Sequence, residues 1–488
     1  MNRPLARLFG VLGVVVLVGF ILPSLSRLPR VGWLPDTQEA AVKGPLEPKY
    51  PEKHHLTSVL AHAPGFTVFE NFRTSANANN RYWRNGTYYI VTDQPWALPA
   101  NKVMFSGGAR DDSHGKPGKV EILSIRLDAI SKHVDERNQL GTTLSPAAAL
   151  AFTEAAEDLP SPMLIAHDDH FIDHYYHWIG ELFLGAWRIW NHWALRTGIK
   201  PPSFEAIAFS RLLAPDELAK TDLHHSWGWA DHAGANEYFM KAFFSPDATI
   251  ESKTTWDARA ATEQLYRIEK AVLADRFAGH AGPSAGWKPW GDVLRVPVDP
   301  NWLADLRDVL LKNYRGKVDM RPKSVPRVSY LTRQDTSRRL LDEAHQDLIH
   351  ALERLQDEGL CELQILHFTD ETPFEDQIAH MAATDVLVGV HGNGLTHTLW
   401  MSPGPGKAVF EIMAKACSMN DYGPLATAAG VRHWQVFETK GMCEVYECPD
   451  RGCDKTFDQL GPNRDDLDVD PKLITDKIRM LVDKHYKN

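Results

Sequence analysis

The run from Asp385 to Thr396 constrains the fold of this chain more than any other segment. It begins with the apolar stretch Val386 to Val390 and continues through His391 into a glycine-rich turn. A short, fully apolar run bounded by turn residues is typical of a buried parallel strand. The glycines let the backbone approach a ligand, and the helix expected next begins with N–H groups that lack intrahelical partners. The run predicts an anion site suited to a phosphate or diphosphate, although a purely structural glycine corner fits the same residues.

The segments around this run alternate between strand and helix patterns. We expect strands at residues 327–332, 363–368, 386–390 and 408–412, separated by helices at residues 340–356, 373–383 and 395–401. Earlier apolar or β-branched runs predict strands at residues 66–69, 87–92, 162–166 and 204–209. Alternation of this kind predicts βαβ units and a parallel, doubly wound sheet, so the expected fold class is α/β. Ligands of such sheets bind beyond the carboxyl ends of the strands, where the glycine turn is expected.

The length and the charge of the chain limit its organisation and its partners. A chain of 488 residues allows two or three domains. A Gly- and Pro-rich stretch over residues 279–300 is the best boundary, and we divide the folded part into residues 61–290 and 291–488. The net charge of −10, with no long basic run, argues against a nucleic-acid partner.

The amino terminus predicts export into the secretory pathway. Arg3 and Arg7 precede an apolar stretch from Leu8 to Leu22. This segment is either a signal peptide cleaved after Ser26 or an uncleaved anchor over residues 1–30, and we favour the anchor with its amino end in the cytosol. Residues 31–60 are polar and Pro-rich and fit a stem. The sequon at Asn85 agrees with a lumenal location.

The five cysteines agree with an oxidising compartment. Cys443, Cys448 and Cys453 crowd one segment, so we expect at least one disulfide there. A zinc site is the alternative, but the sequence contains no CxxC pair. Cys361 and Cys417 are either buried thiols or a further pair.

Three charged residues in the C-terminal half suit a nucleotide diphosphate. Arg333 and Arg338 follow an expected strand, and guanidinium groups match phosphate oxygens in pairs of hydrogen bonds. Their alternative is a solvated basic loop. Glu411 lies inside an expected strand, where a carboxylate at the strand end accepts hydrogen bonds from ribose hydroxyls. Its alternative is a buried ion pair.

The segment from His167 to Glu181 is rich in histidine and acidic residues and leads into a helix expected to reach about Thr197. One face of this helix is apolar: Trp178, Leu182, Ala186, Ile189 and Trp193. His174, His177 and Glu181 lie on another face, either as a solvated polar stripe or as a source of a general base. We take Glu181, His177 and Asp173 as candidate bases. A metal site is a weaker alternative, since no complete ligand signature is present.

Together these motifs resemble glycosyltransferase family 61. The resemblance rests on the run from Asp385 to His397, on Trp400 to Gly404, on Val409 to Ile412, on Tyr175 to Glu181, and on Tyr330 to Arg333 with Arg338 and Arg339. It spans roughly residues 66–440. Asn393 departs from the family pattern, which commonly has a small residue such as Ala at that position.

The resemblance implies a type II, single-pass membrane enzyme of the Golgi or endoplasmic reticulum with a lumenal catalytic part. It implies a GT-B-like fold, in which two Rossmann-like domains face each other across a cleft. Residues 61–290 would present a glycoprotein or polysaccharide acceptor, and residues 291–488 would hold a UDP-sugar. Transfer of N-acetylglucosamine or xylose would be inverting, with no cofactor and no metal. The donor-binding residues would be His391, Gly392, Asn393, Gly394, Leu395, Thr396, Arg333, Arg338 and Glu411.

Two other function classes stay open at this stage. One is a lumenal metal-dependent hydrolase that uses the histidine and aspartate residues between positions 167 and 177. The other is a glycan-binding protein without catalytic activity on the same fold.

Overall fold

The computed structural model describes residues 57–75, 87–92, 122–126, 141–143, 156–169, 171–261, 265–284, 288–312, 314–316, 318–321, 323–336, 338–369, 371–413, 417–437, 441–444, 452–453 and 467–487. The predicted anchor, the sequon at Asn85 and Cys448 lie outside these ranges. Within them, no helix is long and apolar enough to cross a membrane.

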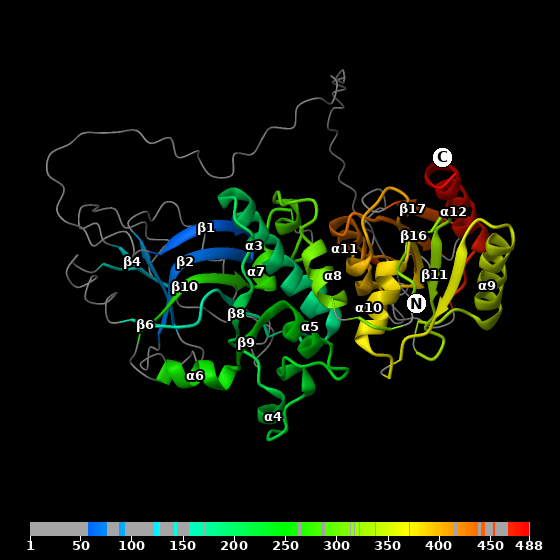
Figure 1. The fold of residues 1–488 in the computed structure, drawn as a ribbon. Coiled ribbons are helices and arrows are strands. Elements are labelled where there is room, and N and C mark those ends of the chain that lie inside the picture. The colour runs from blue at the N-terminus through cyan, green and yellow to red at the C-terminus, as the bar shows by residue number, and fades with distance from the viewer. Residues whose placement is uncertain are drawn as a thin grey trace, which may run out of the picture. The chain divides into compact units, whose positions relative to one another are not determined.

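Among the described residues, the first half of the chain forms one mixed sheet (Figure 1). Its strands are β1 (Ser58–Ala63), β2 (Phe66–Ser75), β3 (Thr87–Thr92), β4 (Ile122–Arg126), β5 (Gly141–Thr143), β6 (Glu157–Asp158), β7 (Met163–Ala166), β8 (Phe204–Phe209), β9 (Phe244–Glu251) and β10 (Leu265–Ala274). The order is β5-β4-β3-β2-β10-β7-β8-β9, with β1 beside β2 and β6 beside β10. Strands β10, β7, β8 and β9 are parallel, whereas β10 runs antiparallel to β2. The four early strands expected from the sequence are confirmed, but this sheet is mixed rather than purely parallel.

The second sheet has the doubly wound order expected from the sequence. Its strands are β11 (Arg327–Leu331), β12 (Glu362–Leu366), β13 (Val386–Val390), β14 (Ala408–Met413), β16 (Arg432–Phe437) and β17 (Gly441–Glu444). They lie in the order β12-β11-β13-β14-β16-β17, parallel except for β17. Strand β12, which follows β11 in the sequence, lies on one side of β11, and the next strand, β13, lies on its other side. The switch point of the topology therefore lies between the carboxyl ends of β11 and β13.

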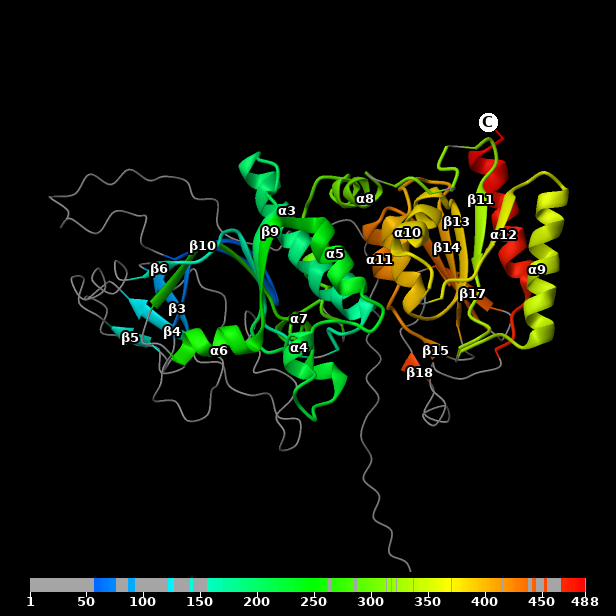
Figure 2. The same ribbon diagram turned by 60° about the horizontal axis from the view of Figure 1, so that its bottom comes forward.

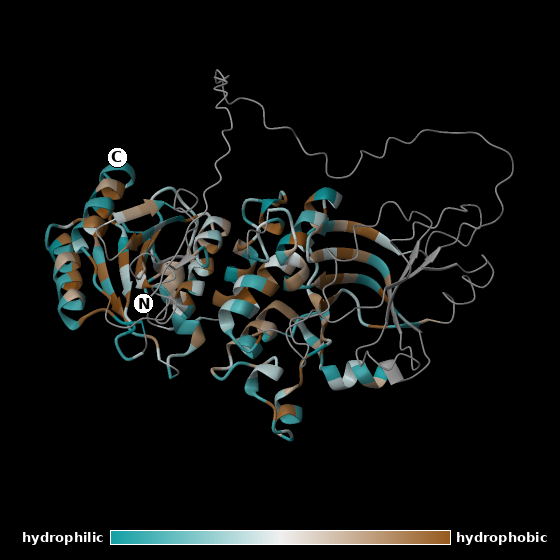
Figure 3. Ribbon diagram, turned by 180° about the vertical axis from the view of Figure 1, so that it is seen from behind, coloured by the Kyte–Doolittle hydropathy of each residue, from teal (hydrophilic) through white to brown (hydrophobic). Residues whose placement is uncertain are grey.

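Helices cover both faces of the second sheet (Figures 1 and 2). Helices α9 (Asp342–Asp357) and α12 (Pro471–His485) pack on the face that carries Val388 and Phe410. Helix α10 (Phe374–Ala383) and the 3₁₀ helix η6 (Asn393–Trp400) belong to the core on the opposite face, with Leu387 and Val409. Successive strand residues point to opposite faces, so burial on both sides explains the continuously apolar strands. Figure 3 shows hydrophobic residues concentrated in these strands and polar residues on the outer sides of the helices.

The helix predicted after the histidine-rich segment is confirmed and begins with a π-helical stretch. This stretch is η3 (Tyr176–Phe183), and it continues as α3 (Leu184–Thr197). All five residues of the predicted apolar face are buried. A Cβ at Gly185 would lie 2.3 Å from the Phe66 ring, so α3 lies directly against β2. One hydrophobic cluster includes this helix and residues of both sheets. Inserted π turns occur frequently at functional sites.

Short elements complete the described fold. They are α4 (Pro215–Leu218), η4 (His225–Trp227), α5 (Ala235–Phe243), α6 (Lys253–Ala261), α7 (Arg276–His280), η5 (Val293–Arg295), α8 (Ala304–Leu311), β15 (Cys417–Ser418), α11 (Gly423–Ala428) and β18 (Gly452–Cys453). Cys361 is a buried free thiol, which rules out its pairing with Cys417. The disulfide among Cys443, Cys448 and Cys453 stays a prediction, as do the domain boundaries.

Candidate active site

The glycine turn forms at the switch point and is built around Arg333. Strand β13 ends at Val390, and Arg333 follows the end of β11. The Nη1 atom of Arg333 donates a hydrogen bond to the carbonyl oxygen of His391 at 3.0 Å. A Cβ at Gly392 would lie 1.7 Å from that Nη1 atom, so only glycine leaves room for the guanidinium. Arg333 and the glycine turn, both named from the sequence as donor-binding candidates, therefore lie together, and their binding of a donor stays a prediction.

Inside the turn, the predicted donor-binding residues fall into two groups. His391 and Gly392 are buried at the turn, whereas Asn393 and Gly394 are partly exposed. Leu395 and Thr396 are buried in the core, so their side chains support the turn rather than line a surface. The backbone amide of Leu395 donates to the carbonyl oxygen of Gly392 at 2.9 Å. That N–H group is therefore used within the turn.

Arg338 lies in the same charged neighbourhood. Its backbone has a φ of 62°, a left-handed conformation that costs free energy for a residue with a side chain and is often found at functional sites. Burial raises the pKa of Tyr422 above its usual range and the charge of Glu411 raises it further, while Arg338 and Arg333 oppose that shift. Tyr422, which the sequence did not single out, therefore lies among the charges of Arg333, Arg338 and Glu411.

Glu411 is completely buried and faces two histidines. Its Oε1 atom accepts a hydrogen bond from His391 Nδ1 at 2.5 Å. His433 Nε2 lies 2.9 Å from Oε2, a close contact that lacks hydrogen-bond geometry. Burial raises the pKa of Glu411, but the bond from His391 and the contact with His433 outweigh it and lower the pKa to about 2. The structure thus favours buried contacts with histidines, in which Glu411 orients His391, over direct binding of a ribose by Glu411.

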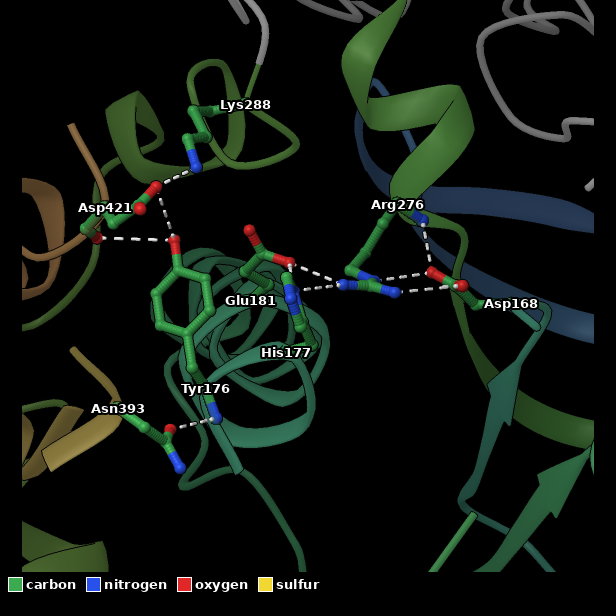
Figure 4. Close-up of polar contacts among 8 residues, drawn as sticks. All are labelled: Asp168, Tyr176, His177, Glu181, Arg276, Lys288, Asn393 and Asp421. Carbon is green, nitrogen blue, oxygen red and sulfur yellow. Dashed lines mark hydrogen bonds and ion pairs between the residues drawn. The ribbon is translucent and has the colours of Figure 1, made fainter. Parts of the chain in front are cut away.

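One hydrogen bond joins the glycine turn to the π-helical segment. Asn393 Oδ1 accepts from the backbone N–H of Tyr176 at 3.1 Å (Figure 4). The first N–H groups of a helix have no partner within the helix. Asn393 therefore caps η3 from a distant part of the chain, which gives a role to the residue that departs from the family pattern.

Glu181 and His177 project from η3 toward Arg276 (Figure 4). Glu181 Oε2 accepts from His177 Nδ1 at 2.7 Å and from Arg276 Nη1 at 2.5 Å. Arg276 also binds both carboxylate oxygens of Asp168, at 2.6 and 3.1 Å. Glu181, Arg276 and Asp168 are buried, and His177 is partly exposed. The alternative of a solvated polar stripe is therefore wrong for Glu181.

The contacts of Glu181 fix its charge and the orientation of His177. Burial raises the pKa of Glu181, but the hydrogen bond from His177 and the charge of Arg276 outweigh it and hold the pKa well below its usual range. Since an ionised carboxylate only accepts hydrogen bonds, His177 Nδ1 donates in its contact with Glu181. Arg276 Nη1, which is also a donor, lies 3.0 Å from the same nitrogen and donates to Glu181 instead. A neutral His177 then carries its lone pair on Nε2, the arrangement that a general base requires.

Asp173, the third candidate base, belongs to a different contact. Its Oδ2 atom lies 2.5 Å from His225 Nδ1. Nearby, Asp169 forms an ion pair with Arg211 at 3.2 Å, and His167 Nδ1 lies 3.2 Å from Ser210 Oγ. Asp169 therefore faces a guanidinium and Asp173 faces an imidazole, and neither faces another carboxylate. Across the described part of the chain, which omits His170, no group of three or more His, Cys, Asp or Glu residues is arranged to hold a metal ion.

A second polar chain anchors the start of the helix against η6. Trp400 Nε1 donates to Tyr175 Oη at 2.8 Å, and that oxygen lies 3.2 Å from His397 Nδ1. His397 Nε2 lies 2.9 Å from Gln377 Oε1. Burial lowers the pKa of His397 to about 3, so the ring is neutral. A neutral ring that accepts at Nδ1 and donates at Nε2 satisfies every contact in this chain.

Several site residues were missed by the sequence reasoning. Arg276 lies two residues beyond the carboxyl end of β10, as Arg333 lies two residues beyond β11, so the same strand-end argument finds it once β10 is recognised. Lys288 and Asp421 form an ion pair beside the Tyr176 hydroxyl, yet both lie in loops without a recognisable pattern. Burial raises the pKa of Tyr176 well above its usual range, and the neighbouring charge of Glu181 adds to the shift.

Comparison with known proteins agrees with this geometry. The family model for glycosyltransferase 61 matches residues 175–409, which run from the start of the histidine-bearing helix to β14. A stretch of 112 residues is 32% identical to the EGF domain-specific O-linked N-acetylglucosamine transferase of Drosophila melanogaster. That stretch covers 23% of this chain and about a fifth (20%) of the length of the relative. The family model over residues 175–409, with the motifs inside it, supports the assignment of this chain to glycosyltransferase family 61.

Proposed function

We propose that the protein is an inverting glycosyltransferase that moves a sugar from a UDP-sugar to a hydroxyl group of a protein or glycan. The observation that carries the proposal is the contact of two strand ends at the switch point. There Arg333 donates a hydrogen bond to the carbonyl oxygen of His391, and a Cβ at the adjacent Gly392 would force the guanidinium to move. Parallel α/β sheets bind their ligands at this position, and a fixed guanidinium beside backbone atoms suits a diphosphate.

Two neighbouring segments divide the reaction between them: η3 activates the acceptor, and the glycine turn stabilises the leaving group. The acceptor hydroxyl gives its proton to His177, which Glu181 orients and the Arg276–Asp168 pair holds in place. The acceptor oxygen then attacks the anomeric carbon from the side opposite to the leaving group, which inverts the configuration. Negative charge develops on the departing UDP, and Arg333 with the turn at Gly392 stabilises it. The hydrogen bond from the Tyr176 N–H group to Asn393 Oδ1 fixes the position of η3 relative to the glycine turn.

The proposed chemistry does not require a metal. The carboxylates of Asp168, Asp169 and Glu181 form ion pairs with arginines, and a paired carboxylate is a poor ligand for a divalent cation. The charge of the leaving group is met by Arg333 instead. For the same reason a metal-dependent hydrolase that uses residues 167–177 is the weaker candidate.

The donor and the location are part of the proposal. The matched Drosophila protein is an O-linked N-acetylglucosamine transferase, which supports UDP-N-acetylglucosamine as the first donor to test, with UDP-xylose as the second. We propose a GT-B-like arrangement and a single-pass type II anchor in the Golgi or endoplasmic reticulum. The apolar segment from Leu8 to Leu22 between basic residues supports that anchor.

A thermal-shift screen tests this function. The lumenal part of the protein is heated with UDP, UDP-N-acetylglucosamine, UDP-xylose or GDP-mannose, each with and without EDTA. A ligand that binds the native state raises the melting temperature by mass action. We expect stabilisation by UDP and by one UDP-sugar, unchanged by EDTA. Glycan binding without any nucleotide effect would favour the non-catalytic alternative, and stabilisation abolished by EDTA would favour a metal-dependent site.

A further inference from the structure

Asp421 occupies a small anion site made by three groups of this chain. Its Oδ1 atom pairs with Lys288 Nζ and lies 3.4 Å from the Tyr176 hydroxyl. Its Oδ2 atom lies 3.6 Å from His391 Nε2. Figure 4 shows Lys288, from a loop, and Tyr176, from η3, converging on this carboxylate. An ammonium, a hydroxyl and an imidazole around one carboxylate are the groups that proteins use to bind a phosphate.

The position of this carboxylate links it to the diphosphate site. His391, which lies next to Asp421, is also the residue whose carbonyl oxygen binds Arg333. The diphosphate expected at the turn would therefore stand beside Asp421, with one negative charge facing another. Like charges this close repel each other strongly in a site that is partly shielded from water. The Asp421 carboxylate and the diphosphate therefore cannot both stay next to His391 without a large cost in electrostatic free energy.

We propose that Asp421 is a resident anion that the donor phosphate displaces, and that Lys288 then becomes a ligand of the phosphate. This inference rests on the proposed function. Lys288 suits the role because it is 9% exposed and lies over the rings of Tyr176 and Trp290, at 5.8 and 5.5 Å. A buried ammonium needs an anion at all times. Asp421 supplies that anion before the donor arrives, and the donor supplies it afterwards.

The test is the dissociation constant of UDP, measured by isothermal titration calorimetry on wild type and two variants. The Asp421→Asn variant loses the competing charge and should bind UDP about tenfold more tightly or better. The double variant Lys288→Met with Asp421→Asn has no unpaired buried charge and should bind UDP at least about tenfold more weakly than Asp421→Asn alone. Uridine, which carries no phosphate, should bind all three proteins equally.

A second ion pair of the same chemistry provides the control. Lys407 forms an ion pair with Asp385. Asp385 immediately precedes β13 and Lys407 immediately precedes β14. The pair therefore lies at the amino ends of the strands, at the edge of the sheet opposite to His391. Asp385→Asn should leave the UDP dissociation constant unchanged. If wild type binds UDP and Asp421→Asn binds it no more tightly, the resident-anion proposal is wrong. If no protein in the set binds UDP, the proposed function itself fails.

Discussion

The side-chain oxygen of Asn393 lies 3.1 Å from the backbone nitrogen of Tyr176, although 217 residues separate the two in sequence. The bond ties the glycine turn to the first turn of the helix that carries His177 and Glu181. A residue that breaks the family pattern thus has a defined structural role.

Replacing Asn393 should weaken this link. Asn393→Ala removes the acceptor of the Tyr176 N–H group and should lower the free energy of unfolding by about 1 kcal/mol, the usual cost of losing a cap. Asn393→Asp keeps an oxygen acceptor and should stay close to wild type. Urea unfolding curves measure both, and an Asn393→Ala protein as stable as wild type would show that the bond contributes nothing.

Removing His177 should stop proton transfer. His177→Ala should reduce kcat by about 10²- to 10⁴-fold with little change in the binding of UDP, because the base acts on the acceptor. Glu181→Gln, which removes the ionised carboxylate that orients His177, should reduce kcat by a smaller factor. His192, which is on the same helix and bonds to the Pro297 carbonyl, gives the matched control His192→Ala. Full transfer activity in His177→Ala would assign the base to another residue.

Glu411 should make the protein sensitive to acid. Its pKa is about 2 in the folded protein against an ordinary 4.5, so the folded state holds this proton less strongly than the unfolded state. The resulting stabilisation is complete above about pH 4.5 and is lost as the pH falls toward 2. It amounts to on the order of 3 kcal/mol.

Melting temperatures between pH 7 and pH 2.5 test this assignment. Glu411→Gln should be less stable than wild type at neutral pH, and its melting temperature should fall less steeply below pH 4.5. Glu371, an exposed carboxylate, provides the control Glu371→Gln, which should follow the wild-type curve. Parallel curves for Glu411→Gln and wild type would show that Glu411 is not the group responsible.

A methyl group at Gly392 should displace Arg333. The added Cβ would stand 1.7 Å from the guanidinium nitrogen, so the end of the Arg333 side chain would have to move and give up its hydrogen bond to the His391 carbonyl oxygen. Gly392→Ala should therefore weaken UDP binding as strongly as the removal of Arg333 itself. Gly404→Ala, where the nearest atom is a flexible Lys407 carbon at 3.3 Å, should bind UDP normally. Unchanged UDP affinity in Gly392→Ala would show that the turn does not take part in binding the donor.

Much of the second sheet could be predicted from the sequence because its strands are continuously apolar. The stretch Val386 to Val390 became β13 without a change of boundary, and Arg333 came to the glycine turn as expected. Such strands are buried on both faces, so their pattern needs no knowledge of their neighbours.

Other features depended on contacts between distant segments. The antiparallel pairing of β10 with β2 makes the first sheet mixed, and no local pattern encodes that pairing. Glu411 looked like a ribose ligand at a strand end, but His433 and His391 enclose it. Lys288 and Asp421 are 133 residues apart in the sequence, and only the folded chain brings them together.

The most direct test of the account is the dissociation constant of UDP for wild type and for Arg333→Ala, both measured in EDTA. The account predicts that wild type binds UDP without a metal and that Arg333→Ala binds it at least about tenfold more weakly, with a fall in turnover of roughly 10²-fold. Equal affinity of the two proteins, or no UDP binding by wild type, would contradict it.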